Sequence, residues 1–219
     1  MRPRVRDALL LTLTAAAGSA DAVSYLGFGR VFTANMTGNL VLLGIAIGQV
    51  QLGSSIRAMI AFAGFVLGVL LGVRLTARTE PAVVWPRSVT VVLAAELGLL
   101  LVLLAIWEIA GARPEALALD LLTALSAGAM GMQTAAVRRL GVTGVTTTFV
   151  TGMLTGLIAE LAAVTPGRSH WTLWAGTLAS MVIGAAAGAG LFLAWRSGAP
   201  LAALGLVATV IAAAAWQKR

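Results

Sequence analysis

The sequence has no cysteine and, in its 219 residues, a single histidine, His170. The lack of cysteine excludes disulfide scaffolds, thiol catalysis and cysteine-ligated metal sites, and it leaves the redox compartment undetermined. One histidine beside eight carboxylates also argues against a metal cage built from protein ligands alone. We therefore expect no metal site and no cofactor.

Charged residues are scarce as well. They make up 11% of the chain, whereas 59% is hydrophobic and the mean hydropathy is +0.96. In soluble domains about a quarter of the residues are charged, so this composition predicts a membrane protein. The net charge of +7 comes mostly from arginines at the ends of apolar segments, where cations contact anionic lipid headgroups. Membrane lipids are thus expected partners. The sequence has no basic cluster interleaved with aromatic residues, so it does not predict nucleic-acid binding.

Catalytic motifs are missing too. One histidine near a segment end does not build a Ser-His-Asp set, and neither an H-E-x-x-H motif nor a phosphate-binding glycine loop after a strand is present. An intramembrane aspartyl enzyme needs two facing aspartates, and Asp21 has only Asp120, near a segment end, as a conceivable mate. The sequence indicates that the protein is not an enzyme.

Long apolar runs dominate what is present. Six runs are long enough to span a bilayer, at 8–28, 56–77, 88–109, 117–137, 172–195 and 199–216. Two shorter runs, 36–50 and 150–164, each follow a stretch rich in glycine and β-branched residues, which favours extended backbone. The first run has the basic head and small-residue end of a signal peptide, but we expect it to stay in the fold because it recurs later in the chain.

The two halves of the chain match each other. "VFTANMTGNL" from residue 31 aligns with "VTTTFVTGML" from residue 145 without a gap. Upstream and downstream segments of small residues also correspond. The alignment predicts one transmembrane domain, 1–219, built from internal repeats of about 1–112 and 113–219, as in many transporters and channels.

Positive charge distinguishes two possible layouts. If the short runs cross, the chain has eight spans in two parallel four-helix repeats, with eight Arg or Lys inside and seven outside. If the short runs enter and return as re-entrant half-helices, six spans form two inverted repeats, with eleven inside and four outside. The positive-inside rule favours the six-span layout with a cytoplasmic N-terminus, and the eight-span layout remains the alternative.

In the six-span layout the short runs make a polar site. Thr37 is expected to cap one half-helix and Thr151 the other, so that two helix N-termini meet near the midplane. Their positive dipole ends favour an anionic or strongly polar solute. The predicted substrate-binding residues are Asp21, Asn35, Thr37, Gly38, Asn39, Thr151 and Gly152. The competing interpretation is that the Thr-Gly pairs only let helices pack closely.

Carboxylates inside the apolar runs are the other functional candidates, because each costs roughly 2.5–3.5 kcal/mol at the centre of a membrane unless it is paired or hydrated. Asp21 is the main candidate for proton or cation coupling, the alternative being a structural partner of Arg30 or of helix N–H groups. Glu96 and Gln133 are candidates for a polar relay. Glu160 lies nearer the interface.

The stretch "AGSADAVSYLGFGRVFTANMTGNLVLLGIAIG" resembles the N-terminal signature of the YoaK family, small bacterial integral membrane proteins grouped as a domain of unknown function. In that family an Asp follows an Ala-Gly segment and precedes a Phe-x-x-Asn-Met-Thr-Gly-Asn run. The matching positions here are Asp21, Phe32, Asn35, Met36, Thr37, Gly38 and Asn39. The resemblance implies a bacterial inner-membrane protein of about six spans, and it implies no biochemical activity.

The sequence therefore predicts an all-α polytopic membrane protein that acts as a small-solute transporter or channel, with a small polar or anionic solute and proton or cation coupling. The alternative is a membrane scaffold that binds lipid through the arginines at one end of the bundle. The glycine-rich runs "GFVLGVLLG" and "IGAAAGAG" are suited to packing either within one chain or in a homo-oligomer.

Overall fold

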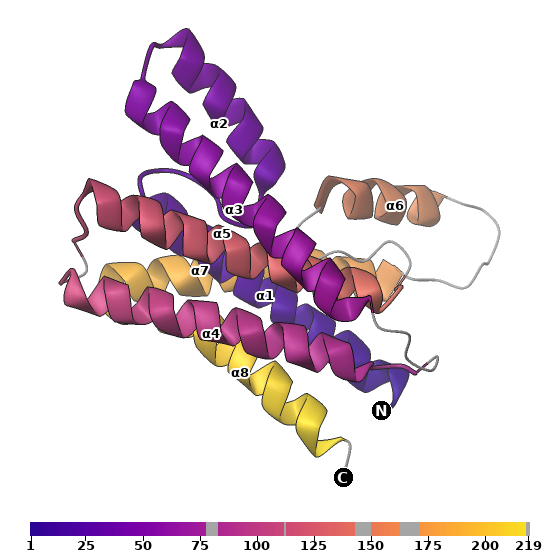
Figure 1. Ribbon diagram of the computed structural model, residues 1–219. Coiled ribbons are helices and arrows are strands. Elements are labelled where there is room, and N and C mark those ends of the chain that lie inside the picture. The colour runs from indigo at the N-terminus through magenta and orange to yellow at the C-terminus, as the bar shows by residue number, and fades with distance from the viewer. Residues whose placement is uncertain (78–82, 112, 143–149, 163–170, 218–219) are drawn as a thin grey trace.

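The computed structural model describes residues 1–77, 83–111, 113–142, 150–162 and 171–217, and these form eight helices and no strand (Figure 1). The helices are α1 (Pro3–Gly27), α2 (Met36–Gly48), α3 (Leu52–Thr76), α4 (Arg87–Ile109), α5 (Ala116–Arg139), α6 (Val150–Ala162), α7 (Trp171–Ala194) and α8 (Leu201–Trp216). The predicted all-α polytopic membrane class is confirmed.

Five of these helices, α1, α3, α4, α5 and α7, are long and apolar enough to cross a membrane. Each predicted long run coincides over most of its length with one long helix or with α8, and each predicted short run contains α2 or α6. The main difference is that α1 begins at Pro3 rather than at residue 8, because proline is well accommodated in the first turn of a helix. At 13 residues, α2 and α6 are each about 20 Å long, too short for a hydrocarbon core of about 30 Å.

Contacts at one end of the bundle show the directions of the long helices. The Trp107 indole N–H donates to the carbonyl of Arg196 over 3.0 Å, which joins the end of α4 to the end of α7. Gly27, the last residue of α1, faces the rings of both Trp107 and Phe192. The ends of α1, α4 and α7 therefore lie together.

The beginnings of the other long helices lie at this same end. The Arg57 guanidinium pairs with the Asp120 carboxylate at 3.2 Å, which joins the start of α3 to the start of α5, and it lies against Gly29 just beyond α1. Ala199, just before α8, belongs to the apolar cluster that contains Trp107. The helices α1, α3, α4, α5, α7 and α8 thus alternate in direction. As a result α2 connects two helix ends on the same side of the bundle, and Figure 1 shows it as a hairpin with α3.

Glycines let two pairs of helices come into backbone contact. A Cβ at Gly68 of α3 would overlap the Gly128 carbonyl of α5, and a Cβ at Gly184 of α7 would overlap the backbone of Ala15 in α1. Gly68 belongs to the glycine-rich run "GFVLGVLLG" and Gly184 to "IGAAAGAG". Both runs therefore pack within the chain, α3 on α5 and α7 on α1.

The main core lies between α1, α4, α5 and α8, where side chains such as Leu13, Leu93, Met130 and Val207 are fully buried. The pairs α4 with α5 and α1 with α8 also pack together, as do α4 and α8. This core supports the inner face of α1, while the opposite face of α1 is left to α7 and to the segment that follows α1.

Candidate functional site

The segment between α1 and α2 folds back along α1. The chain turns at Gly29 and Arg30, which have φ angles of 88° and 61°, in the left-handed region that glycine adopts at little cost. Residues 31–35 then run beside α1 without helical hydrogen bonds. Because their amides lie next to an apolar bundle, each needs a local partner.

Asp21 supplies partners for this segment. Its Oδ1 accepts hydrogen bonds from the backbone N–H groups of Thr33, at 2.8 Å, and Ala34, at 2.6 Å, and the amide of Asn35 also faces the carboxylate. Asp21 lies six residues before the end of α1, so the start of α2 is held about 9 Å inside the bundle from that end. Asp21 therefore has a structural role toward backbone N–H groups rather than toward Arg30, although these groups belong to the extended segment and not, as expected, to a helix.

Two asparagines complete the anchoring. The Asn39 side chain binds Phe32 twice, accepting from its N–H at 2.8 Å and donating to its carbonyl at 2.6 Å. Asn35 is the N-cap of α2, and its Oδ1 accepts from the Gly38 N–H at 3.1 Å. The expectation that Thr37 is the cap was wrong, because the helix already begins at Met36 and an N-cap side chain binds the amide three residues on.

From α5, the Ser126 hydroxyl donates to the Thr33 hydroxyl at 2.9 Å. Both residues are buried, so this bond links the extended segment to the second half of the chain. The segment is thereby held by α1, α2 and α5 together.

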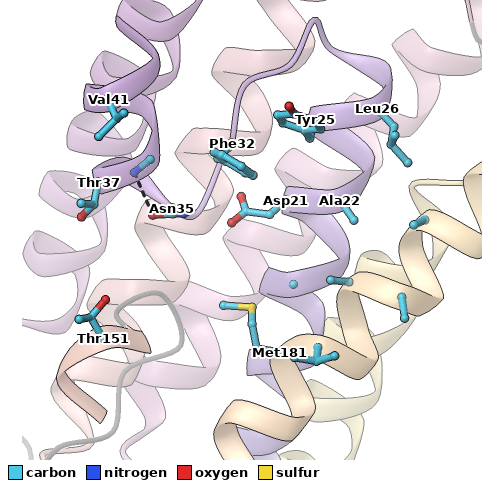
Figure 2. A pocket seen from close by; sticks show the side chains of 16 residues that line it. Asp21, Ala22, Tyr25, Leu26, Phe32, Asn35, Thr37, Val41, Thr151 and Met181 are labelled. Atoms are coloured by element: carbon cyan, nitrogen blue, oxygen red, sulfur yellow. Dashed lines mark hydrogen bonds between the residues drawn. The ribbon is translucent and has the colours of Figure 1, made fainter. Parts of the chain in front are cut away.

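A cavity of about 820 Å³ lies beside this anchored segment, in the size range of small-molecule sites, roughly 300–1,000 Å³. Its wall is formed by α1, the extended segment and α2 on one side, and by α7 and Thr151 of α6 on the other. Figure 2 shows the Asp21 carboxyl group pointing toward Asn35, whose side chain is bound to Gly38, with Thr37 and Thr151 on separate helices and Met181 on the side of α7. Both halves of the chain thus contribute to one cavity.

The structure brings some of the predicted site residues together and separates others. Five of the seven predicted substrate-binding residues line the cavity, namely Asp21, Asn35, Thr37, Gly38 and Thr151. Asn39 is buried with its side chain bound to Phe32, and it does not line the cavity. Gly152 is exposed on α6 and does not line it either. The stretch before the second short run is predicted to be extended as well, over residues 141–150, and of these residues 143–149 lie outside the described residues.

The two other predicted relay residues lie in the core and not in the cavity. Gln133 donates from Nε2 to the carbonyl of Leu13 at 3.0 Å, which ties α5 to α1, and its Oε1 has no partner in the described structure. Glu96 is fully buried in α4, and neither of its carboxyl oxygens has a hydrogen-bond partner among the described residues. Neither side chain lines the cavity beside Asp21, so the three residues do not form a continuous polar path along its wall.

Sequence reasoning missed the apolar part of the wall. Tyr25 and Phe32 line the cavity with their rings stacked at 5.2 Å, and Met181 and Val182 face them from α7. Tyr25 lies four residues after Asp21, one helical turn on, which would have placed it on the same face of α1. No comparable signal marks Met181 or Val182, because every face of α7 is apolar.

Comparison with known proteins agrees with the helical fold. The model of the family described as "Protein of unknown function (DUF1275)" matches residues 9–214. The chain is 38% identical over 160 residues to the "UPF0700 transmembrane protein YoaK" of Bacillus subtilis (strain 168), covering 72% of this chain and 68% of that protein. No solved structure matches. With a family model that matches along nearly its whole length, this multi-pass transmembrane protein belongs to the DUF1275 family.

Proposed function

We propose that the protein is a small-solute transporter whose solute binds in the cavity between the two halves of the chain. The observation that carries this proposal is the cavity itself, where a buried carboxylate, Asp21, and the start of a half-helix meet a wall supplied by α6 and α7. Broken helices that meet at a central site are the usual construction of secondary transporters. The sequence has a single histidine and no recognisable catalytic motif, so transport is proposed rather than catalysis.

The proposal includes two inverted repeats. In two such repeats α1–α4 correspond in order to α5–α8, so each contact between helices should have an equivalent. The contact of α3 with α5 corresponds to that of α7 with α1, and the contact of α4 with α5 to that of α8 with α1. The contact of α2 with α3 corresponds to that of α6 with α7, and all of these pairs are in contact. The half-helices α2 and α6 begin at residues that the sequence alignment pairs, Met36 and Val150. Because α1 and α5 run in opposite directions, this correspondence supports an inverted arrangement and therefore six spans.

Transport would proceed by rocking of one part of the bundle against the other around the cavity. The cavity lies where α1 and α2 face α6 and α7, so relative movement of these elements would change which side of the membrane it opens to. Glycine-mediated contacts such as Gly184 with Ala15 are smooth surfaces with few interlocking side chains, which suits a sliding interface.

The orientation follows from the distribution of arginines. The end of the bundle that holds the N-terminus carries Arg2, Arg4, Arg6, Arg74, Arg87, Arg138 and Arg139, whereas the described arginines toward the other end are Arg30, Arg57, Arg113 and Arg196. By the positive-inside rule, the N-terminus is cytoplasmic in a bacterial inner membrane. The same basic end is suited to anionic lipid headgroups, which is the observation that supports the alternative function of a lipid-binding scaffold.

The topology has a direct test, because the chain has no cysteine of its own. Single cysteines at Ser54 and Ala77, exposed positions at the two ends of α3, are treated in intact cells with a membrane-impermeant thiol reagent. Six spans predict labelling at Ser54→Cys and protection at Ala77→Cys. Eight spans reverse both results, because α2 would then cross the membrane and α3 would run in the opposite direction.

The transport proposal has a separate test in proteoliposomes. Cysteines at Thr37 and Thr151 line the cavity, whereas a cysteine at Leu193, an exposed position of α7 outside it, is the control. A transporter predicts that impermeant thiol reagents reach both cavity positions from water and that Leu193→Cys stays unreactive. If the cavity positions are as unreactive as Leu193→Cys from both sides, the cavity has no aqueous route and the transport proposal fails.

A further inference from the structure

We infer that the cavity binds hydrophobic organic cations, meaning a positively charged ammonium or similar centre attached to an apolar body. This inference rests on the proposed function, since it names the solute class of the same cavity. It replaces the anionic solute expected from helix dipoles alone, and the argument depends on what Asp21 does to those dipoles.

The charge of the cavity is negative. Among the described residues that line it, Asp21 carries the only formal charge, and no arginine is in the wall. Residues 143–149, outside the described residues, contain no ionisable side chain in their sequence. Among the described lining residues an anion would therefore meet a carboxylate and no cation to offset it, which is unfavourable in a medium of low dielectric constant.

The positive end of α2 is already compensated. A helix N-terminus carries about half a positive charge on its free N–H groups. Here the Met36 N–H binds the carbonyl of Ala34 and the Gly38 N–H binds the Asn35 side chain. The Asp21 carboxylate, which accepts from Thr33 and Ala34 just before the helix, also lies close to this helix end. Few of these donors remain for an anionic ligand, and the full charge of the carboxylate exceeds the partial charge of the helix end.

Asp21 keeps capacity for a ligand. The hydrogen bonds from Thr33 and Ala34 both use Oδ1, and a carboxylate has about four acceptor positions on its two oxygens. Asp21 is only 8% exposed, and what is exposed faces the cavity. A cationic centre is the ligand group that such a shielded carboxylate attracts most strongly.

The remainder of the wall is suited to an apolar body. Tyr25 and Phe32 present stacked aromatic rings beside Asp21, and aromatic rings also attract cations. Met181 of α7 faces them across the cavity, and methionine adapts to ligands of varied shape.

One side of the cavity opens toward the membrane. Val41 of α2 and Val182 of α7 line it and are 59% and 68% exposed, on helices whose outer faces are apolar. A solute that partitions into the bilayer can therefore enter sideways between α2 and α7. Small hydrophilic cations lack that route and gain little from this wall.

The test uses a pair of ions of nearly the same shape and opposite charge, tetraphenylphosphonium and tetraphenylborate. The full-length protein is placed in phosphatidylcholine nanodiscs, and saturable binding of each labelled ion is measured against empty nanodiscs. We expect saturable binding of the phosphonium and none of the borate. Asp21→Asn should weaken phosphonium binding at least about tenfold while keeping an oxygen that accepts from Thr33 and Ala34.

A second pair of variants tests the location without touching the anchored segment. Val182→Trp fills the open side of the cavity, whereas Ile183→Trp, at 65% exposure on the next residue, does not line it. Phosphonium binding should be lost in Val182→Trp and kept in Ile183→Trp, and equal binding in the two variants would overturn the location.

The outcomes separate this inference from the transport proposal. The cationic solute class is overturned if tetraphenylborate binds as tightly as tetraphenylphosphonium, or if neither ion shows saturable binding. Cavity cysteines that water reaches would still support transport of another solute in that case. If phosphonium binds and this binding depends on both Asp21 and Val182, the cationic solute class is supported. This holds even if the cysteines at Thr37 and Thr151 are unreactive and the transport proposal fails.

Discussion

Asp21 and Glu96 are both carboxylates buried within a membrane-spanning helix, but their surroundings differ. Asp21 holds the amides of Thr33 and Ala34 and borders the cavity. Glu96 of α4 is fully buried, and its oxygens have no partner in the described part of the chain. The first carboxylate organises a neighbouring segment, whereas the second does not hold any described group in place.

This difference shows that position inside an apolar run does not by itself make a carboxylate functional. The cost of burying Asp21 is offset by backbone N–H groups that would otherwise be unsatisfied in the membrane. The cost of burying Glu96 is not offset by anything in the described structure. Substitutions at the two sites should therefore have opposite effects on stability.

The largest effect is expected for Asp21→Ala, which leaves the N–H groups of Thr33 and Ala34 without their acceptor. The free energy of unfolding should fall by about 3 kcal/mol or more, since each buried unpaired group costs about 1–3 kcal/mol. Thermal unfolding of the purified protein in detergent would measure this, together with protease sensitivity of residues 28–35. A stability equal to that of the wild type would remove Asp21 from its anchoring role.

A smaller loss is expected for Asn39→Met, which introduces the residue found at the aligned position of the second half, Met153. The variant loses both side-chain bonds to Phe32, so we expect a loss of about 2 kcal/mol. The same unfolding measurement applies, with Leu40→Met, at an exposed neighbouring position, as the control. Equal stability of the two variants would show that the extended segment is held without Asn39.

A gain is expected for Glu96→Met, which replaces an unpaired buried carboxyl group with an apolar side chain of similar length. The unfolding free energy should rise by about 1–3 kcal/mol, because removing an unsatisfied buried polar group recovers its desolvation cost. Solute transport and phosphonium binding should persist. A loss of transport in a stable Glu96→Met protein would instead give Glu96 a part in the mechanism.

The smallest stability effect is expected for Asp21→Asn, below about 1 kcal/mol, because the amide oxygen still accepts from the two N–H groups. Binding of tetraphenylphosphonium should nevertheless weaken at least about tenfold. A variant that unfolds as readily as Asp21→Ala would show that the charge of Asp21, and not its position as an acceptor, holds the segment.

Much of the fold was predictable because apolar runs in a membrane protein have few alternatives to helices. The six long runs and the two short runs each became helices, and Asp21, Asn35 and Thr37 were identified from the residues around the first short run. The N-cap was placed two residues late, since Asn35 and Thr37 are both good caps and the sequence does not show where the first helical turn closes.

Other parts of the site were not predictable from local patterns. Asn39 was expected to bind solute, and only the fold shows that its side chain is occupied by the backbone of Phe32. The apolar wall of α7 carries no sequence signal, because lipid-facing and cavity-facing valines are chemically the same. Which of them faces the cavity depends on how α7 rotates against α1.

The sequence by itself determined that this protein resides in a membrane, how many apolar helices it has and which of them are too short to cross, because hydropathy and length are properties of the chain alone. Tertiary structure decided which polar groups remain free. A carboxylate, two asparagines and a glycine-rich stripe each have several possible partners along the sequence. The packing of α1 against α7, and of the extended segment against Asp21, selects one partner for each and leaves one carboxylate at the edge of a cavity.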